Sequence, residues 1–282
     1  MDNPSNTSLK NGVDRISRAE MTFGDFLLAF SGGDLVLLAF FGGLITSLLN
    51  MVGCIPVLFL RGSAEKFTDL GLGFASGVML AASFTSLILP GIESGGVFPV
   101  LVGILLGTLV VSYMDKLIPH MHFIKIGVEG RRSRLKAVWL FVLAITIHNM
   151  PEGLAVGVGF GSGKLASAMA LMIAIGLQNI PEGLSVGLSL ASSKEYTRAK
   201  SYLIAALSGI VELPLAVLGA AAVIAVHQVL PYAMGFAAGA MIFVVSDEII
   251  PEVHRLGKER AITFSLIIGL MLMLFLDVAL KA

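Results

Sequence analysis

Two stretches decide the fold of this chain: His148-Asn149-Met150-Pro151-Glu152-Gly153 and Gln178-Asn179-Ile180-Pro181-Glu182-Gly183. Each lies in the middle of an apolar segment that is long enough to cross a lipid bilayer. Each also places a carboxylate, with amide or imidazole groups beside it, at a depth where hydrocarbon is expected. Because ionisable side chains at that depth are costly, they mark an ion or substrate path by default. The two stretches therefore predict membrane-spanning helices that enclose a polar site.

The composition is that of a polytopic membrane protein. Of the 282 residues, 56% are hydrophobic and only 13% are charged, with a mean hydropathy of +0.91; a soluble domain carries about 25% charged residues. The net charge is zero, so nothing suggests nucleic-acid binding. The single Cys54 excludes a disulfide framework and a thiolate metal cluster. Residues 1–20 are polar and lack the apolar core and cleavage site of a signal peptide.

Eight segments are apolar over the length of about 20 residues that a helix needs to span a bilayer. They are 35–60, 70–91, 97–118, 137–160, 166–191, 202–226, 232–252 and 261–280. No segment alternates in the way that is typical of strands, so we expect an all-α polytopic membrane protein. Residues 1–34 should form a polar tail with a short interfacial segment at 21–30. Residues 35–282 should form the eight-helix domain, with a cytoplasmic loop at about 119–136.

Lysine and arginine are concentrated in alternate loops, which predicts the orientation of the helices. Of the 19 basic residues, 14 lie in the loops after the first, third, fifth and seventh expected helices. The loops after the second, fourth and sixth helices contain only Lys164. Both termini should therefore face outside, in a protein of the inner or plasma membrane of the cell.

The sequence contains internal repeats whose orientations are opposite. The fourth and fifth expected helices run in opposite senses, yet both carry Asn-x-Pro-Glu-Gly. A weaker pair relates 73–79 (GFASGVM) on the second helix to 235–241 (GFAAGAM) on the seventh, and Ile-Leu-Pro or Ile-Ile-Pro follows each. Opposed repeats imply a two-fold pseudo-symmetry axis in the membrane plane, a design that secondary transporters use with the binding site at the midplane.

The spacing within each string puts its polar groups on one side of a helix. His148 and Glu152 are four residues apart and project together, and Gln178 and Glu182 repeat that geometry. Pro151 in the first string, like its counterpart in the second, removes a backbone hydrogen bond and is expected to kink the helix. A carbonyl group freed in this way is tolerated at membrane depth where it lines a cavity.

A third carboxylate, Glu212, lies in the middle of the sixth expected helix, and no lysine or arginine is near it in sequence. Three such carboxylates cannot all stay ionised without compensation, so either they are protonated or a cation binds among them. One imidazole, three carboxylates and several amide oxygens suit zinc, and also cadmium, iron or manganese. The alternative is that the glutamates are neutral and only join helices by hydrogen bonds. His148 beside them favours the metal site.

With these motifs the chain resembles the ZIP family of divalent-metal transporters, most of all its prokaryotic members. The resemblance covers all eight expected helices, and the paired strings are highly specific to that family. It implies uptake of zinc and related ions through a two-metal site between the second, fourth, fifth and sixth helices. It assigns the first metal position to His148, Glu152, Gln178 and Glu182 with Met79. The second position comprises Asn149, Asn179 and Glu212, and shares Glu152, Gln178 and Glu182.

The chain departs from the family pattern at three of these or nearby positions. Some members have Asp in place of Asn179, and many have His in place of Gln178, which puts the occupancy of the second position and the metal preference in question. Where the family often has His before the glutamate of the seventh helix, this chain has Asp247 before Glu248.

The resemblance also implies a metal path on either side of the site. At the outer mouth it places Ser86, Glu93 and Asp277. Near the inner ends of the helices it places Asp69, Asp115, His120, His122, Asp247, Glu248, Glu252 and His254. Each of these residues alone is equally well explained as an ordinary interfacial polar residue. Together they form the series of weak oxygen and nitrogen sites that conduction requires.

We therefore expect a transporter, not an enzyme, that moves zinc-like ions into the cytoplasm by alternating access and uses the metal as substrate and not as a catalytic cofactor. The resemblance favours an elevator-like shift of a bundle that contains the fourth and fifth helices. One alternative is a metal-selective channel with the same site. Another is an intramembrane metalloprotease, but that chemistry needs His-Glu-x-x-His, which the sequence does not contain. The sequence is also compatible with a homodimer in the lipid bilayer.

Overall fold

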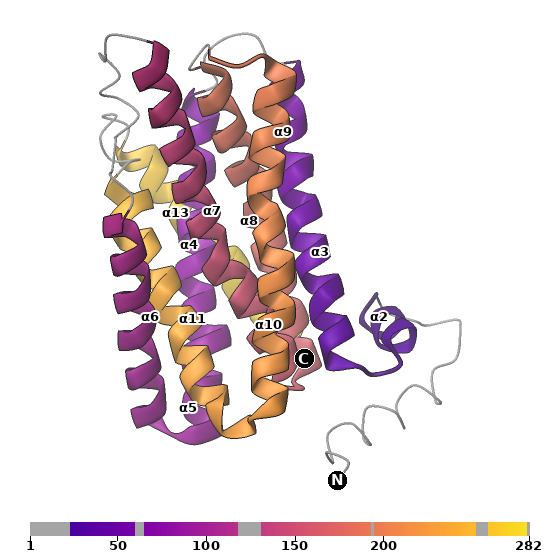
Figure 1. Ribbon diagram of the computed structural model, residues 1–282. Coiled ribbons are helices and arrows are strands. Elements are labelled where there is room, and N and C mark those ends of the chain that lie inside the picture. Colours follow the sequence, from indigo (N-terminus) through magenta and orange to yellow (C-terminus); the bar gives the residue numbers. More distant parts are fainter. Residues whose placement is uncertain (1–22, 60–64, 118–130, 193–194, 252–258, 281–282) are drawn as a thin grey trace.

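The computed structural model describes residues 23–59, 65–117, 131–192, 195–251 and 259–280. Helices account for nearly all of these residues, and no strand occurs among them, which agrees with the expected all-α class. Figure 1 shows the long helices side by side in one bundle, with roughly parallel axes.

The α-helices are α2 (Phe23–Ser31), α3 (Leu35–Cys54), α4 (Glu65–Ala82), α5 (Leu89–Gly95), α6 (Val97–Leu117), α7 (Arg131–Gly161), α8 (Leu165–Ser192), α9 (Arg198–Ser208), α10 (Glu212–Ala225), α11 (Leu230–Val244) and α13 (Glu259–Ala279). Tighter 3-10 turns continue or join them at Ile55–Leu58, Gly209–Val211 and His227–Val229. Wider π turns follow α4 at Ser83–Ile88 and α11 at Val245–Ile249.

Within the described ranges, seven helical segments are long and apolar enough to cross a membrane. They are Leu35–Leu58, Asp69–Gly95, Val97–Lys116, Leu165–Ser192, Arg198–Ala225, His227–Asp247 and Arg260–Ala279. These segments coincide with seven of the eight expected spans. The remaining expected span, 137–160, lies within the 31-residue helix α7, which is not among the seven. The multi-pass membrane class is therefore established, whereas the count of eight spans and the outside placement of both termini remain predictions.

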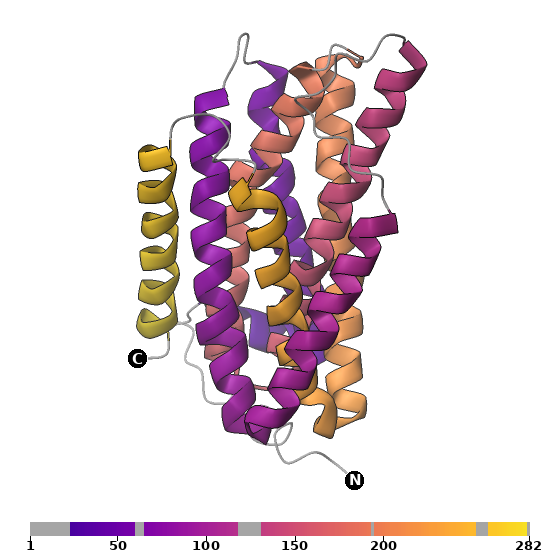
Figure 2. The same cartoon turned by 90° about the vertical axis from the view of Figure 1, so that its left-hand side faces the viewer.

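The helices divide into two groups by their strongest mutual packing. In one group α3 packs against α8 and α10 packs against α7, and in the other α6 packs against α11 and α13 packs against α4. Figure 1 shows α6 and α11 on one side of the bundle and α3, α9 and α10 on the other. Figure 2 shows α13 at the edge of the bundle beside α4. The helices α6 and α13 expose large apolar side chains, such as Phe98 and Phe275, as lipid-facing helices do.

A constant shift of 162 residues relates the first and last thirds of the chain. It is the distance in sequence between the repeated motifs at 73–79 and 235–241, and it also separates the hydrogen-bonded residues Ser47 and Gly209. The shift also relates their helix contacts. A Cβ atom built on Gly77 of α4 would collide with the carbonyl of Leu266 on α13, and one built on Gly239 of α11 would collide with the carbonyl of Ile104 on α6. Each contact is the image of the other under the shift, in line with the inverted repeat that the sequence predicts.

The two π turns obey the same relation, because Ser83 and Val245, at which they begin, are also separated by this shift. A π turn inserts an extra residue into a helical turn, and such turns occur frequently at functional sites. Each of these turns ends near one of the prolines that follow the repeated motif. The sequence gives no local signal for either turn.

The two proline-containing helices are continuous. Helix α7 runs through Pro151 and α8 runs through Pro181 without a break, and the expected kinks stay a prediction. Each proline lacks the N–H group that would bond the carbonyl one turn earlier, that of Ile147 or Leu177. A tight turn joins the helices, in which Gly163 has a φ of 75° and the Ser162 hydroxyl donates to the Gly159 carbonyl at 2.7 Å. This hairpin places the two polar strings side by side.

Candidate metal centre

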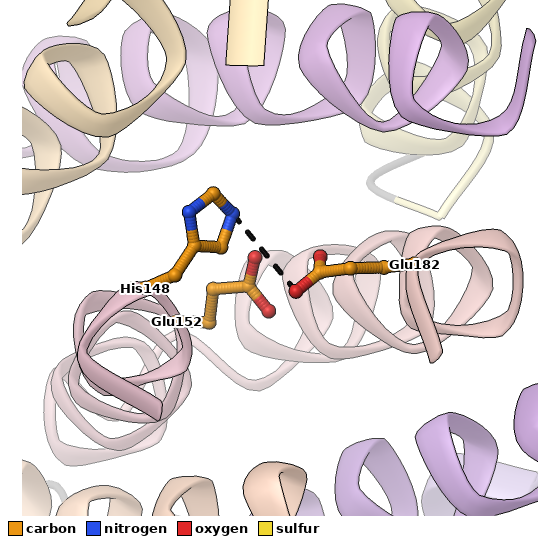
Figure 3. A group of neighbouring side chains, drawn as sticks. All are labelled: His148, Glu152 and Glu182. Carbon is orange, nitrogen blue, oxygen red and sulfur yellow. Dashed lines mark ion pairs between the residues drawn. The ribbon is translucent and has the colours of Figure 1, made fainter. Parts of the chain in front are cut away.

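The centre forms where the two polar strings meet between α7 and α8. One ligand atom each from His148, Glu152 and Glu182 lies within 4.8 Å of the others. The three side chains are almost fully inaccessible, with exposed fractions of 3%, 0% and 2%. Figure 3 shows that His148 and Glu152 project together from α7 toward Glu182 on α8, as their four-residue spacing predicts. An imidazole and two carboxylates at this separation can share one divalent cation.

The polar groups of the two strings are paired crosswise. His148 Nε2 lies 3.9 Å from Glu182 Oε1, and Gln178 Nε2 donates a hydrogen bond to Glu152 Oε1. In each case the first residue of one string contacts the glutamate of the other. The internal two-fold symmetry therefore passes through the centre itself and exchanges His148 with Gln178.

Glu212 joins this centre from α10 through the second string. Asn179 Nδ2 donates to both carboxylate oxygens of Glu212, at 2.8 and 3.0 Å, and lies 3.3 Å from the carbonyl of Thr46 on α3. Glu212 itself is fully buried. It can approach α7 closely because Gly153 has no side chain: a Cβ atom there would lie 2.5 Å from the Glu212 carbonyl oxygen. The glycine of the first string thus sets the distance between α7 and α10.

Several oxygens of the centre are buried without a hydrogen-bond partner among the described residues. They are Asn149 Oδ1, Glu152 Oε2, Gln178 Oε1 and Asn179 Oδ1, and Asn149 Nδ2 is likewise unsatisfied. Buried polar atoms normally have partners, so unsatisfied ones need a specific explanation such as an ion. Because the amide nitrogens of Gln178 and Asn179 already bond carboxylates, their oxygens stay available as ligands. The donor set therefore fits a divalent cation.

The sequence around the buried carboxylates contains no lysine or arginine over the stretches 141–161, 165–192 and 202–225. Removing unpaired carboxylates from water costs several kcal/mol per charge. A bound cation would offset this cost.

The structure places Met79 on α4, fully buried in the apolar core that α4 shares with its neighbours. The helix α4 packs against α8, which carries the second string. Met79 lies on a helix next to the centre, and its role as a ligand remains a prediction.

Of the three residues expected at the outer mouth, two contact each other. Ser86 lies in the first π turn, and its hydroxyl donates to Asp277 Oδ1 on α13 at 3.2 Å; both side chains are buried. Glu93 is exposed on α5, and its Oε2 lies 3.4 Å from Lys164 Nζ in the turn between α7 and α8. This contact links the α7–α8 hairpin, which carries the two polar strings, to α5.

The residues expected near the inner ends are only partly described. Asp69 on α4 is buried, Asp115 on α6 is half-buried and Asp247 in the second π turn is exposed. Glu248 lies in the same π turn, and its side chain is outside the described part of the structure. His120, His122, Glu252 and His254 are outside the described residues.

The polar side of α3 was not predicted from the sequence. Thr46, Ser47 and Asn50 are all buried in it, and the Thr46 carbonyl accepts from Asn179. Ser47 and Asn50 donate to carbonyls of the α9–α10 segment, those of Gly209 at 2.9 Å and Ala205 at 3.2 Å. These side chains are uncharged and lie in a strongly apolar segment, so nothing marked them. The shift of 162 residues, which pairs Asn50 with Glu212, was the signal available.

Fold and site together define a class: a multi-pass membrane protein whose buried imidazole, carboxylate and amide groups form a candidate metal centre between its helices. Comparison with known proteins identifies the family. Residues 125–277 match the family model described as "ZIP Zinc transporter". The chain belongs to the ZIP family of zinc transporters, which are transport proteins and not enzymes.

Curated relatives support this assignment over most of the chain. Zinc transporter ZIPB of Bordetella bronchiseptica is 41% identical over 255 residues, which cover 86% of this chain and 81% of the relative. Zinc transporter GufA of Myxococcus xanthus is 37% identical, with 84% of this chain and 98% of the relative covered. Zinc transporter ZIP11 of Homo sapiens is 35% identical, with 88% and 99% covered.

Proposed function

We propose that this chain carries zinc, and also cadmium, iron or manganese, across the cell membrane into the cytoplasm through the centre between α7, α8 and α10. The observation that supports the proposal most strongly is the triad of His148, Glu152 and Glu182 within 4.8 Å. The amide oxygens of Asn149, Gln178 and Asn179 around it are buried and have no hydrogen-bond partner in the described part of the chain, and a cation would satisfy them. The relatives are named zinc transporters, which favours zinc as the first substrate.

The number and type of ligands in the centre suit two ions. His148 contacts Glu182, Gln178 contacts Glu152, and Asn179 contacts Glu212; we take Glu152, Glu182 and Gln178 as the ligands that both positions share. We assign the first position to His148 with these shared ligands and Met79. The second position uses the Asn149 and Asn179 oxygens with Glu212. Amide oxygens are weaker ligands than carboxylates, and thiolates are absent from this set. Both features suit a site that must release its ion.

Outside the centre, weak ligands define the path. Ions collect at Glu93, pass the Ser86 and Asp277 pair, and reach the centre. They leave by way of Asp69, Asp115 and Asp247 at the opposite ends of the helices. The remaining predicted ligands on this side are Glu248, Glu252, His120, His122 and His254.

We infer alternating access from the division of the bundle. The centre belongs to the group formed by α3, α7, α8 and α10, in which α8 packs against α4 and α7 packs against α11 of the other group. Close glycine contacts join helices within each group, such as Gly157 of α7 against Ala216 of α10 and Gly77 of α4 against Leu266 of α13. Such close packing favours movement of each group as a unit. A shift of one group against the other would move the centre between the two mouths. A metal-selective channel with the same centre is the second candidate, and saturable flux that is inhibited by metal on the opposite side argues against it.

Flux into proteoliposomes tests the proposal. Zinc and cadmium uptake is measured for the native chain, His148→Ala and Glu182→Ala, with His227→Ala as the matched control because His227 is exposed and distant in sequence from the centre. We expect uptake by the native chain and the control, and its loss in both centre variants at unchanged folded yield. Normal uptake by folded Glu182→Ala would refute the site assignment.

A further inference from the structure

The internal two-fold symmetry relates Asn50 to Glu212. The shift of 162 residues that pairs Ser47 with Gly209 also carries Asn50 on α3 to Glu212 on α10. The contacts agree. Gly153 of the first string faces the backbone of Glu212, and Gly183 of the second string faces the carbonyl and side chain of Asn50. The symmetry thus puts an amide on the α3 side of the centre where the α10 side has a carboxylate.

Asn50 fills a gap between two segments that carry ligands. A Cβ atom on Gly183 would lie 2.7 Å from Asn50 Oδ1, and one on Gly209 would lie 2.6 Å from Asn50 Nδ2. Gly183 directly follows Glu182 on α8, and Gly209 begins the 3-10 turn that leads into Glu212. The side chain of Asn50 is only 2% exposed. It therefore fixes the distance between the helix of Glu182 and the turn before Glu212.

The amide is chemically suited to its place. Its Nδ2 donates to the carbonyl of Ala205 at 3.2 Å, and the Ser208 hydroxyl donates to the same carbonyl at 2.8 Å. The helix α9 ends at Ser208 and gives way to the 3-10 turn, so this carbonyl is satisfied by side chains at the end of the helix. An ionised carboxylate at position 50 could not donate this bond, and it would add a fourth negative charge to the buried centre.

We propose that Asn50 is a positioning residue for metal binding. As the neutral counterpart of Glu212, it holds Glu182 and Glu212 at their working distance and confines the second metal position to the α10 side. This inference rests on the proposed function, since it assumes that Glu182 and Glu212 bind the ion. Residues that orient metal ligands cost about 10–100-fold in affinity when they are changed.

The test is zinc binding by the purified full-length protein in lipid nanodiscs. Affinity and the number of ions bound are measured on the folded fraction of the native chain, Asn50→Ala and Thr108→Ala. Thr108 is the matched control because its hydroxyl also donates to a carbonyl on a neighbouring helix, that of Gly239 at 3.3 Å, but between α6 and α11 and not beside the ligands. We expect Asn50→Ala to lose at least about tenfold in affinity, and Thr108→Ala to stay within about twofold of the native value. Equal losses in both variants, or none in Asn50→Ala, would overturn the inference.

Asn50→Asp keeps the size of the side chain and tests the inference even if the alanine variant does not fold. It removes the donor to Ala205 and adds a carboxylate on the α3 side. We expect Glu212→Asn alone to lose the second bound ion. The double variant Asn50→Asp with Glu212→Asn should bind that ion again. A double variant that binds no more metal than Glu212→Asn would contradict the role of Asn50 as the counterpart of Glu212. Glu182→Ala separates the two levels: if it also binds zinc normally, the proposed centre itself fails.

Discussion

Replacing Gly153 by alanine should disable the centre while the protein stays folded. A Cβ atom at this position would lie 2.5 Å from the carbonyl oxygen of Glu212 and 2.6 Å from its Cα atom. Ordinary contact begins at 3.4 Å, so α7 and α10 must separate by about 0.9 Å. Both neighbouring atoms belong to the backbone and cannot rotate away. The separation moves Glu212 away from Glu152, which is one residue before the substitution.

The expected magnitudes differ for stability and for transport. Overpacking lowers the free energy of unfolding by about 1–3 kcal/mol. The higher helix propensity of alanine relative to glycine raises it by about 1 kcal/mol. The net loss of stability is therefore small. A displacement of about 1 Å between reacting or ligating groups can cost about 100-fold in activity. We expect zinc flux to fall by about 10–100-fold in Gly153→Ala at a nearly unchanged unfolding temperature.

Gly159→Ala is the matched control for this prediction. Gly159 lies on the same helix, but a Cβ atom there would meet only the side-chain Leu171 Cδ2 at 3.3 Å and Ala168 atoms at 3.7 Å and beyond. Leu171 can adjust by a few tenths of an ångström, so this variant gains helix propensity at little cost. Initial rates of zinc uptake and thermal unfolding are measured for both variants. If Gly153→Ala transports zinc as well as Gly159→Ala does, the argument from helix separation is wrong.

Three further predictions follow from the contacts of the path and the centre. Lys164→Met should change flux by less than about fivefold, because exposed ion pairs contribute at most about 1 kcal/mol; a loss of more than about tenfold would contradict this weak role of the Lys164–Glu93 pair. Asp277→Asn should raise the KM for zinc and leave the maximum rate unchanged, because it weakens capture at the outer mouth beside Ser86; an effect on the maximum rate alone would contradict this. Zinc at 100 times its Kd should raise the free energy of unfolding by about 2.7 kcal/mol, measured by thermal shift, and Glu182→Gln should abolish the rise.

The helical fold was largely predictable because hydropathy dictates it. Seven of the expected spans recur as candidate spans, since an apolar segment of that length in lipid must satisfy its backbone within a helix. The π turns at Ser83 and Val245 were not predictable, because the extra residue in a turn leaves no mark on hydropathy. The kinks at Pro151 and Pro181 were expected from proline alone; α7 and α8 are not broken at these residues, and the kinks stay a prediction.

The core of the centre was predictable from local spacing. His148 and Glu152 share a helix face, and a short hairpin brings Glu182 opposite them. Spacing says nothing about the partners that orient these ligands. The crossed pairing of Gln178 with Glu152 and the position of Asn50 depend on helix contacts between residues far apart in sequence. They are visible only once α3 and α10 are placed on either side of the strings.

The symmetry of the centre is broken twice, and both times in the same direction. The two-fold relation exchanges His148 with Gln178 and Glu212 with Asn50. The imidazole and the carboxylate of these exchanges lie on α7 and α10, which pack against each other, and the two neutral amides lie on α8 and α3, which also pack against each other. A symmetric centre would hold an ion equally from both sides. Here the α7–α10 side carries the imidazole and one more carboxylate than the α8–α3 side, so we infer that it holds the ion more strongly. The α8–α3 side offers one carboxylate, Glu182, and weaker amide ligands such as Gln178, and we infer that the ion breaks its bonds to this side first when it leaves.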